Sequence, residues 1–296
     1  MIELKEINLE NKDELSEYLR YNETSEFTFT NMFCWRSLNG MQYFELDGAI
    51  CFIWKNRENN TRISFPIGNC TNLKGTIEKV IQYFEEIGEP PRIYLYNEKV
   101  KELFNGLFPE QFIIEEDVNH ADYIYNVKEL INLSGNKYHK KKNHINKFKS
   151  LYSCEYKKVT AEEIPECKRI FNEWYNSKTE LASDTYGERT KIAIYELFNN
   201  FDKLDAVGGA IYVDGKMTAF SFGEKLGNNI VDIYYEYADI SYEGVYQIMN
   251  QQFLEHEWSN LEFANRECDL GYPGLRKSKL SYHPEYMARK YVAMLK

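Results

Sequence analysis

The hydrophobic and polar positions in the first half of the chain predict alternating strands and helices. A hairpin is predicted over 43–54, where largely apolar runs flank the pair Asp47-Gly48, because Asp-Gly is typical of the two-residue turn of a β-hairpin. Short strands are predicted over 62–66 and 93–96, and between them apolar residues recur with helical spacing over 73–87. The remaining predicted elements of this half are helices over 24–37 and 98–107.

The second half shows the same order of patterns. A hairpin around Asp214-Gly215 is predicted over 210–223, and a strand, a helix and another strand follow over 230–237, 243–258 and 261–264. Gly48 precedes Gly215 by 167 residues, and Asn97 precedes Asn265 by 168. We infer two copies of one unit made of a hairpin, a strand, a helix and a strand. Chance similarity between two ordinary α/β domains is the alternative.

Length supports the same division. At 296 residues the chain exceeds the usual size of a single hydrophobic core. We therefore expect a two-domain α/β protein of the α+β kind, in which each domain is a mixed, twisted sheet flanked by helices. One domain is expected over 1–120 and the other over 121–296.

Charge is unevenly distributed between these domains. The chain has a net charge of −10; residues 1–120 hold 21 acidic and 12 basic side chains, and residues 121–296 hold 25 and 24. The first domain should repel polyanions and is expected to be structural or to face a partner. The total disfavours general nucleic-acid binding but leaves room for a local anion site in the second domain.

Cysteine and histidine usage argues against a metal site. The six cysteines form no Cys-x-x-Cys pair and the five histidines are dispersed, so neither a zinc site nor metal catalysis is expected. The chain shows neither the pattern of a secretory signal nor an apolar run of about 18 residues. These features predict a cytoplasmic protein with reduced thiols.

A basic segment connects the two predicted domains. Six lysines and no acidic residue lie between Lys137 and Lys149. A solvated helix or linker is the simplest interpretation, since runs of charge are commonly exposed. Apolar residues such as Ile145 and Phe148 interrupt the charge, however, and would fix the segment to a folded body. A fixed cationic segment is suited to binding a phosphate or an anionic head group.

A second polar segment follows the last predicted strand. The apolar run 261–264 ends abruptly in Asn265, Arg266, Glu267 and Asp269, and a Gly-Tyr-Pro-Gly turn leads into Arg276, Lys277 and Lys279. Polar residues at the end of a strand are typical of a cleft in an open α/β sheet, where a rigid scaffold holds the loops. A solvated surface loop is the alternative.

These two segments resemble an uncharacterised bacterial family related to the C-terminal domain of phosphatidylglycerol lysyltransferase. The similarity is carried by 135–148 and by Asn-Arg-Glu-x-Asp-Leu-Gly-x-x-Gly-Leu-Arg-Lys-x-Lys over 265–279, and it covers nearly the whole chain. The resemblance implies two tandem acyltransferase domains of the GNAT type with the working site in the second. Relatives transfer an aminoacyl group from charged tRNA to a lipid, and the Fem peptidyl transferases have a similar fold.

The coenzyme A loop of GNAT acetyltransferases is not intact in this chain. Those enzymes bind the pyrophosphate through Arg/Gln-x-x-Gly-x-Gly/Ala at the start of a helix. The matching windows are Ser241-Tyr-Glu-Gly-Val-Tyr246 and Asn72-Leu-Lys-Gly-Thr-Ile77, and a tyrosine in the last place would crowd a pyrophosphate. The departure weakens acetyl transfer and fits the aminoacyl-transferring relatives.

Glu236, Asn265 and Arg266 are the candidate catalytic residues. Glu236 lies at the end of a predicted strand among tyrosines, where desolvation would raise its pKa and make it a general base. A structural carboxylate paired with Arg266 is the alternative. Asn265 and Arg266 would orient the acyl carbonyl, or either would cap the following loop.

The candidate substrate-binding residues come from the two basic segments. They are Lys141, Lys142, Asn143, Asp269, Arg276 and Lys279. Arg276 and Lys279 share one helix face at i,i+3, and we expect them to converge with Lys141 and Lys142 on one anion site. The alternatives are that each basic segment only solubilises its own surface, and that Asp269 holds the loop by an Asx-type bond.

The sequence therefore predicts an acyltransferase that moves an aminoacyl group to an amine or hydroxyl. Charged tRNA is the favoured donor, acetyl-coenzyme A is the second choice, and no permanently bound cofactor is expected. The partner would be a tRNA acceptor end or another phosphate-bearing ligand, and peripheral contact with a membrane stays open. The rival functions are a non-catalytic ligand-binding module and an atypical coenzyme A-dependent N-acetyltransferase.

Overall fold

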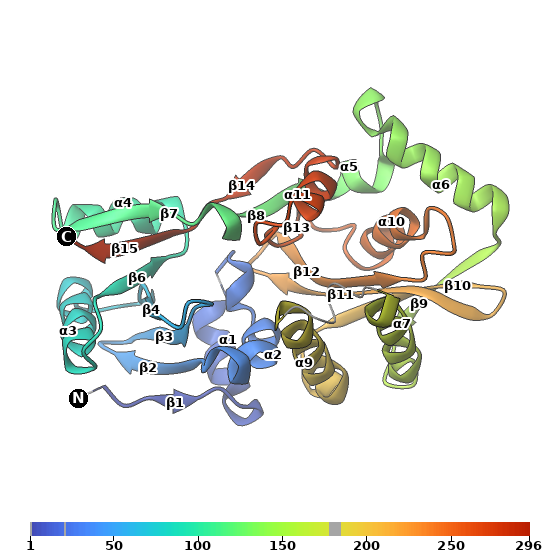
Figure 1. Cartoon of the computed structure of the whole chain (residues 1–296). Coiled ribbons are helices and arrows are strands. Elements are labelled where there is room, and N and C mark those ends of the chain that lie inside the picture. Colours follow the sequence, from blue (N-terminus) through green and yellow to red (C-terminus); the bar gives the residue numbers. More distant parts are fainter. Residues whose placement is uncertain (1, 21, 178–184) are drawn as a thin grey trace. The chain divides into compact units, whose positions relative to one another are not determined.

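The computed structural model describes residues 2–20, 22–177 and 185–296, and it divides into two compact units. The first unit consists of Met1–Asp122, Cys268–Tyr272 and Met287–Lys296, and the second of Tyr123–Glu267 and Pro273–Tyr286. Each is built on a mixed sheet flanked by helices, so the predicted fold class is confirmed (Figure 1).

The sheet of the first unit has the order β1-β2-β3-β4-β6-β15-β7, with β5 paired to β3. β4 and β6 are parallel, and the other pairs are antiparallel. Its strands are β1 (Lys5–Glu6), β2 (Gln42–Leu46), β3 (Ala49–Lys55), β4 (Thr61–Ser64), β5 (Ile67–Gly68), β6 (Arg92–Leu95), β7 (Phe112–Glu116) and β15 (Tyr291–Leu295). Its helices are α1 (Lys12–Leu19), α2 (Phe29–Asn39), α3 (Leu73–Glu86) and α4 (Glu98–Leu107), with 3-10 turns η1 (Leu9–Asn11), η2 (Ser25–Phe27) and η3 (Val118–His120).

Helix α3 shows how the hydrophobic pattern becomes a core. The side chain of Asn72 accepts a hydrogen bond from the Gly75 N–H at 3.2 Å, which satisfies one of the free donors at the start of the helix. Ile77, Val80 and Phe84 then recur on one face and are buried against the sheet. The helix predicted over 73–87 is therefore present and packs as its spacing predicts.

The C-terminal end of the chain departs from the predicted domain division. Strand β15 lies between β6 and β7 and pairs with both, so residues 287–296 belong to the first unit rather than to a domain over 121–296. Without β15 the facing edges of β6 and β7 would each expose a row of backbone hydrogen-bonding groups. The return of the C-terminus thus completes the sheet of the first unit.

A buried ion cluster fixes this returning segment. The ammonium of Lys290 contacts Asp122 Oδ1 at 2.8 Å and also binds Glu26, and Ser25 Oγ donates to Asp122 Oδ2 at 2.7 Å. Lys290 is 1% exposed and Asp122 is fully buried. The pKa of Lys290 is raised because the charges of Asp122 and Glu26 outweigh the effect of burial, so the lysine stays charged.

The second unit contains the sheet β14-β8-β13-β12-β11-β10-β9. β12 and β13 are parallel, whereas β12 is antiparallel to β11 and β13 is antiparallel to β8. The strands are β8 (Asp122–Asn126), β9 (Cys154–Val159), β10 (Val207–Val213), β11 (Lys216–Leu226), β12 (Ile230–Ala238), β13 (Phe263–Asn265) and β14 (Tyr286–Ala288). The helices are α5 (Val127–Asn132), α6 (His139–Leu151), α7 (Ile164–Ser177), α9 (Thr185–Asn200), α10 (Val245–Glu257) and α11 (Pro273–Leu280), with turns η4 (Asn136–Tyr138) and η5 (Phe201–Lys203).

Helices cover both faces of this sheet. α7 and α9 lie on one face of the sheet (Figure 1). There, the ring of Phe171 packs on Tyr237 and that of Phe198 on Phe222. α10 lies on the other face, where the strand position Gly209 lies beneath its Phe253 and beside the Tyr156 hydroxyl, which a β-carbon there would approach to 2.2 Å. A β-carbon at Gly209 would come within 2.7 Å of the Phe253 ring.

Both units contain the predicted order of hairpin, strand, helix and strand. In the first unit these are β2-β3, β4, α3 and β6, and in the second they are β10-β11, β12, α10 and β13. In each copy the two single strands are parallel neighbours, as expected when a helix connects them. The predicted repeat is therefore present in the structure.

Strands β12 and β13 separate part of the way along β12. Their pairing ends at Asp232 and Asn265, while β12 continues to Ala238 and stays paired to β11. From Ile233 onward, the edge of β12 that faced β13 has no strand partner among the described residues. This opening is the part of the second unit where side chains from several elements meet.

Replacing Lys290 with Met should destabilise the first unit by about 3–5 kcal/mol, because it leaves the buried Asp122 carboxylate without its cation. Urea unfolding measures the loss. Adding Asp122→Asn to that variant should recover part of the stability, and Lys296→Met at an exposed position should change it by less than about 0.5 kcal/mol. A loss below about 1 kcal/mol for Lys290→Met would contradict the role of the ion cluster.

Candidate functional site

Glu236 lies in the opening between β12 and β13. Its Oε1 contacts Arg266 Nη2 at 3.3 Å, and its Oε2 is 3.4 Å from Asn250 Nδ2 on α10. The side chains of Glu236 and Arg266 are only 13% and 16% exposed. Burial raises the pKa of Glu236, and the charge of Arg266 and the hydrogen bond from Asn250 offset part of this rise. The carboxylate is thus both desolvated and ion-paired.

Arg266 is the first residue after β13, and its position is fixed at both ends. Its backbone N–H donates to the carbonyl of Tyr123 at 3.1 Å, and its guanidinium lies 4.9 Å from the ring centre of Tyr282 and 5.9 Å from that of Tyr125. Burial lowers the pKa of Arg266, but Glu236 together with Tyr282 and Tyr125 outweighs this effect, so the pKa is raised overall. A permanently charged guanidinium therefore spans the opening between the two strands.

Lys141 of α6 joins this group. Its Nζ lies 3.9 Å from the ring centre of Tyr282, and burial, followed by the charge of Arg266, lowers its pKa to about 8. Lys141 is half-buried because it shares a helix face with the buried residues Tyr138, Ile145 and Phe148. These four residues are three, four and three positions apart, which places them on one face of a helix. The sequence alone therefore distinguishes Lys141, on the buried face, from the neighbouring lysines.

Tyr282 is a site residue that the sequence analysis missed. It is 5% exposed, and burial raises its pKa to about 12 even though the charge of Arg266 and hydrogen bonds with Gln247 and Arg266 act to lower it. Tyr138 fixes its backbone by donating a hydrogen bond from the hydroxyl to the Tyr282 carbonyl at 3.1 Å. Tyr282 lies three residues after the motif over 265–279, and the sequence offers nothing to distinguish it from the other tyrosines, of which the chain has 24 in all.

Of the four cations expected to converge, the structure relates two to Glu236. Lys141 and Lys279 both act electrostatically on that carboxylate. Lys279 also donates to the backbone carbonyls of Arg266 and Glu267, so its ammonium helps to hold the turn after β13. Arg276 lies one turn earlier on α11 and is half-buried. Shared binding of one anion by these cations stays a prediction.

Lys142 and Asn143 lie on the exposed face of α6. The Asn143 amide is 3.4 Å from His139 Nδ1 on the same helix, which places it along the surface of α6. If they bind substrate as predicted, they would do so at the rim of the site and not beside Glu236.

Asn265 and Asp269 shape the loop that follows β13. Asn265 Oδ1 accepts a hydrogen bond from the Glu267 N–H at 2.7 Å, and Asp269 Oδ1 accepts one from the Gly271 N–H at 2.8 Å. Both residues are almost fully buried. Both contacts are hydrogen bonds between a side chain and the backbone two residues later, as expected if Asn265 caps the loop and Asp269 holds it by an Asx-type bond. The bond of Asp269 lies within Cys268–Tyr272, which belongs to the first unit.

The start of α10, where a coenzyme A pyrophosphate would sit, is covered by α6. Gly244 has a φ of 87°, and a β-carbon there would lie 2.4 Å from the His144 carbonyl oxygen and 3.2 Å from the Phe148 side chain. Lys147 forms an ion pair with Glu243 at 2.6 Å across the same contact. The backbone at this helix start is thus packed against protein instead of facing a ligand.

Tyr246 occupies the other end of the same loop. Its hydroxyl accepts a hydrogen bond from the backbone N–H of Ala238, the last residue of β12, and interacts with Trp174. Burial raises the pKa of Tyr246. The tyrosine that was expected to crowd a pyrophosphate therefore binds the end of β12, beyond the point where its pairing with β13 stops.

The corresponding region of the first unit is filled with aromatic rings. The ring of Phe27 stacks on Phe52 at 5.2 Å and lies edge-on to Trp54, Tyr94 and Tyr96 at 5.9–6.5 Å. Phe27 and Tyr94 are almost fully buried. Apolar packing thus replaces the polar group that lies between β12 and β13.

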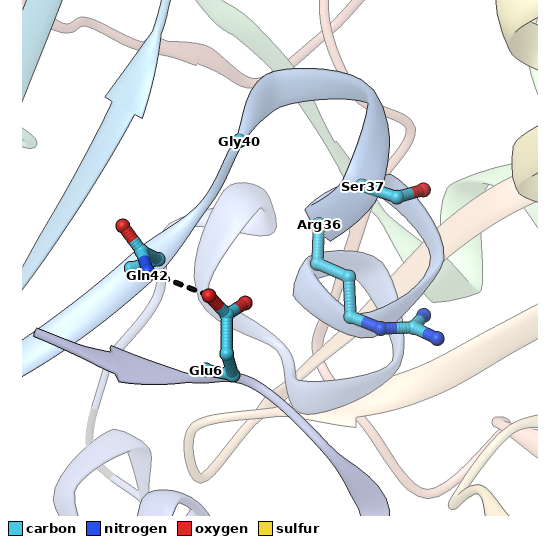
Figure 2. A pocket seen from close by; sticks show the side chains of 5 residues that line it. All are labelled: Glu6, Arg36, Ser37, Gly40 and Gln42. Carbon is cyan, nitrogen blue, oxygen red and sulfur yellow. Dashed lines mark hydrogen bonds between the residues drawn. The ribbon is translucent and has the colours of Figure 1, made fainter.

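A shallow pocket of about 400 Å³ in the first unit does not present a comparable group. Figure 2 shows Glu6, Arg36, Ser37, Gly40 and Gln42 around it, with Gln42 Nε2 donating to Glu6 Oε1 at 2.6 Å. The guanidinium of Arg36 stacks on the Phe33 ring at 3.6 Å and donates to the carbonyl of Phe33. Both charged groups therefore already interact with neighbouring parts of the protein.

Within residues 2–20, 22–177 and 185–296, no cluster of three or more His, Cys, Asp or Glu side chains has an arrangement that could hold a metal ion. No helix in this part of the chain has both the length and the apolar character needed to cross a membrane.

Replacing Gly244 with Ala should destabilise the second unit by about 2–3 kcal/mol. The β-carbon would collide with α6, and a residue with a side chain is strained at this positive φ. Gly274→Ala is the matched control, because a β-carbon there meets no atom within 4 Å. Thermal unfolding of both variants checks this, and equal stability of the two would show that α6 does not close the start of α10.

The chain has similar counterparts among solved structures. A conserved protein of unknown function from Bacteroides thetaiotaomicron is 31% identical, with a TM-score of 0.93 and full coverage of both chains. The structure of L-PGS from Bacillus licheniformis has a TM-score of 0.71 at 14% identity, covering 99% of this chain and 93% of the other. The first of these extends the similarity over the entire chain, and the second shows a shared fold.

Two further solved structures share the fold at lower identity. FemX has a TM-score of 0.63 at 9% identity, covering 99% of this chain and 97% of its own. A tandem GNAT protein from the clavulanic acid biosynthesis pathway has a TM-score of 0.51 at 8% identity, covering 99% and 98%. The two units of this chain are accordingly GNAT-like.

Among curated proteins, an uncharacterised protein from Mycoplasmoides gallisepticum is 26% identical over 175 residues, which is 58% of this chain. The match spans 55% of that protein, about half its length. The model of the family described as "Phosphatidylglycerol lysyltransferase, C-terminal" matches residues 19–294. The chain therefore belongs to the phosphatidylglycerol lysyltransferase C-terminal family, whose fold is shared with acyltransferases.

Proposed function

We propose that the second unit transfers an aminoacyl group from an activated ester, a charged tRNA, to an amine or hydroxyl acceptor. The observation that supports this most is the group formed by Glu236, Arg266 and Lys141 in the opening beside β12. It combines a desolvated carboxylate with two cations where the edge of a strand is left without a strand partner. Family membership and the GNAT-like fold support acyl transfer in general.

Glu236 is the proposed general base. The acceptor nitrogen or oxygen attacks the acyl carbon, a new bond forms there, and the proton of the acceptor passes to the carboxylate. The ester bond then breaks, and the departing ribose oxygen takes up a proton, so that no proton is gained or lost overall. Burial favours this role because it raises the pKa of Glu236 and strengthens it as a proton acceptor.

Arg266 is proposed to stabilise the charge that develops on the acyl oxygen. Its guanidinium is held before any substrate binds, by Glu236 on one side and by Tyr282 on the other. A preorganised donor needs no reorganisation during the reaction, which is how oxyanion sites contribute most. Asn250 also contacts Glu236 and would keep the carboxylate oriented towards the opening.

The closed start of α10 supports an ester donor over acetyl-coenzyme A. α6 packs on Gly244, and the Tyr246 hydroxyl binds the end of β12, where GNAT acetyltransferases would require open backbone donors. Because charged tRNA is a cytoplasmic molecule, we place the reaction in the cytoplasm. The family's description makes phosphatidylglycerol one hydroxyl acceptor to test.

A non-catalytic binding module is the second candidate. The contact between Glu236 and Arg266 favours it, because a carboxylate already in an ion pair is a weaker base than a free one. In this case the same group would bind a ligand without transferring any part of it.

A ligand panel separates these functions. Thermal unfolding is measured with a tRNA analogue that carries its aminoacyl group through a stable amide, with uncharged tRNA, with coenzyme A and with acetyl-coenzyme A. We expect stabilisation of about 2.7 kcal/mol by the charged analogue at a hundredfold excess over its Kd, and none by either coenzyme. Stabilisation by acetyl-coenzyme A alone would exclude the tRNA donor.

A further inference from the structure

Tyr282 contacts both cations that flank Glu236. The Lys141 ammonium lies 3.9 Å from its ring centre, and the Arg266 guanidinium lies 4.9 Å from the same point. Tyr282 is itself immobilised, because its carbonyl accepts a hydrogen bond from Tyr138 and its backbone N–H donates to the Lys279 carbonyl at 3.1 Å. One buried ring thus fixes charged groups that come from α6 and from the end of β13.

An aromatic ring holds a cation differently from a carboxylate. The ring quadrupole attracts the cation but carries no net charge, so the cation keeps its full attraction for an anion. Among the described residues no carboxylate forms an ion pair with Lys141, and Glu236 is the acidic partner of Arg266. Lys279 binds backbone carbonyls, which are also neutral. In the part of the chain that the structure describes, Glu236 is thus the one buried carboxylate that faces both Lys141 and Arg266.

We infer that Tyr282 is a positioning residue that presents Lys141 and Arg266 as a two-cation site for a single phosphate group. This inference rests on the proposed function and deepens it, because it identifies the part of the substrate that the opening holds beside the acyl group. A guanidinium with a second cation beside it suits phosphate, since charge-assisted hydrogen bonds to both are strong. The site differs from the predicted set of Lys141, Lys142, Arg276 and Lys279. Only Lys141 is kept, and Arg266, positioned by Tyr282, is the second cation.

The phosphate could belong to a nucleotide or to a lipid head group, and both present the same chemistry to Lys141 and Arg266. Adenosine 5′-monophosphate represents the nucleotide, and water-soluble dihexanoyl-phosphatidylglycerol represents the lipid. Tighter binding of one probe assigns the source. Inorganic phosphate is the reference for the site without either attached group.

The dependence of binding on pH distinguishes this role from a structural one. The groups that face Lys141 are Arg266, which follows β13, Glu236 on β12, and Tyr282 in the segment after α11. Burial and the charge of Arg266 lower the pKa of Lys141 to about 8. Arg266 stays charged, and a phosphate monoester with its second pKa near 6 is fully ionised above pH 7. Affinity for adenosine 5′-monophosphate should therefore fall about tenfold between pH 7 and pH 9, as Lys141 loses its proton.

Three variants test the inference by calorimetric titration with the same nucleotide. Tyr282→Phe keeps the ring and should retain affinity within about threefold together with the fall at high pH. Tyr282→Leu removes the ring and should weaken binding at least tenfold and abolish the pH dependence. Lys141→Met should do the same, whereas Lys140→Met, an exposed neighbour on α6, should leave both unchanged.

Retained affinity and pH dependence in Tyr282→Leu would overturn the role of the ring. If that variant does not fold, equal binding by Lys141→Met and the unaltered protein would overturn the site on its own. Absence of binding by all three phosphate probes would do so as well. Phosphate binding without aminoacyl transfer would uphold this site and contradict the proposed function, so the two fail separately.

Discussion

The ion pair between Glu236 and Arg266 is the interaction on which the candidate site depends. Backbone pairing between β12 and β13 ends at Asp232 and Asn265, and beyond that point this pair connects the two strands. Removing either partner would leave an uncompensated charge in a poorly solvated place, which costs about 3–5 kcal/mol. The same pair offsets part of the rise that burial causes in the pKa of Glu236, and it orients the guanidinium of Arg266, so one contact serves both the opening and its chemistry.

The two units share one topology but differ in the side chains that surround the parallel pair of strands. In both, a parallel pair of strands is connected by a helix, and in both the sequence between and around them decides what fills the space. In the first unit Phe27 and its aromatic neighbours fill it and a buried cluster around Lys290 completes the fold. In the second unit Glu236, Arg266 and Lys141 keep it polar. Hydrophobic burial therefore makes the first unit a scaffold, and electrostatics makes the second a candidate site.

Local patterns were sufficient to predict most of the repeat. Asp47-Gly48 and Asp214-Gly215 each form the turn of a hairpin, and the apolar spacing of α3 and α10 places both helices on their sheets. These features depend on neighbouring residues, which a single sequence displays. The return of β15 to the first unit was not predictable, because it depends on the open edges of β6 and β7, and these exist only once the sheet has formed.

The same distinction applies to the site. Glu236, Arg266 and Lys141 could be proposed because each lies in a polar or basic interruption of an apolar pattern. Separating Lys141 from Lys142 required the phase of α6, and Tyr282 could be found only from its contacts, since nothing in the sequence distinguishes it from other tyrosines. The side chains of Asn265 and Asp269 accept hydrogen bonds from backbone N–H groups of their own loop, where the chain forms neither a strand nor a helix that would bind those groups.

The most direct test of aminoacyl transfer is a single-turnover experiment with excess protein and tRNA charged with a radiolabelled amino acid. Glycinamide serves as the amine acceptor and phosphatidylglycerol as the hydroxyl acceptor, and the label is followed from tRNA to product. We predict transfer by the unaltered protein, a loss of about 10²–10⁴-fold in Glu236→Gln, and an unchanged rate in Glu255→Gln, which alters an exposed carboxylate of α10. A Glu236→Gln variant that transfers at the original rate, or no transfer to either acceptor, would contradict the assignment.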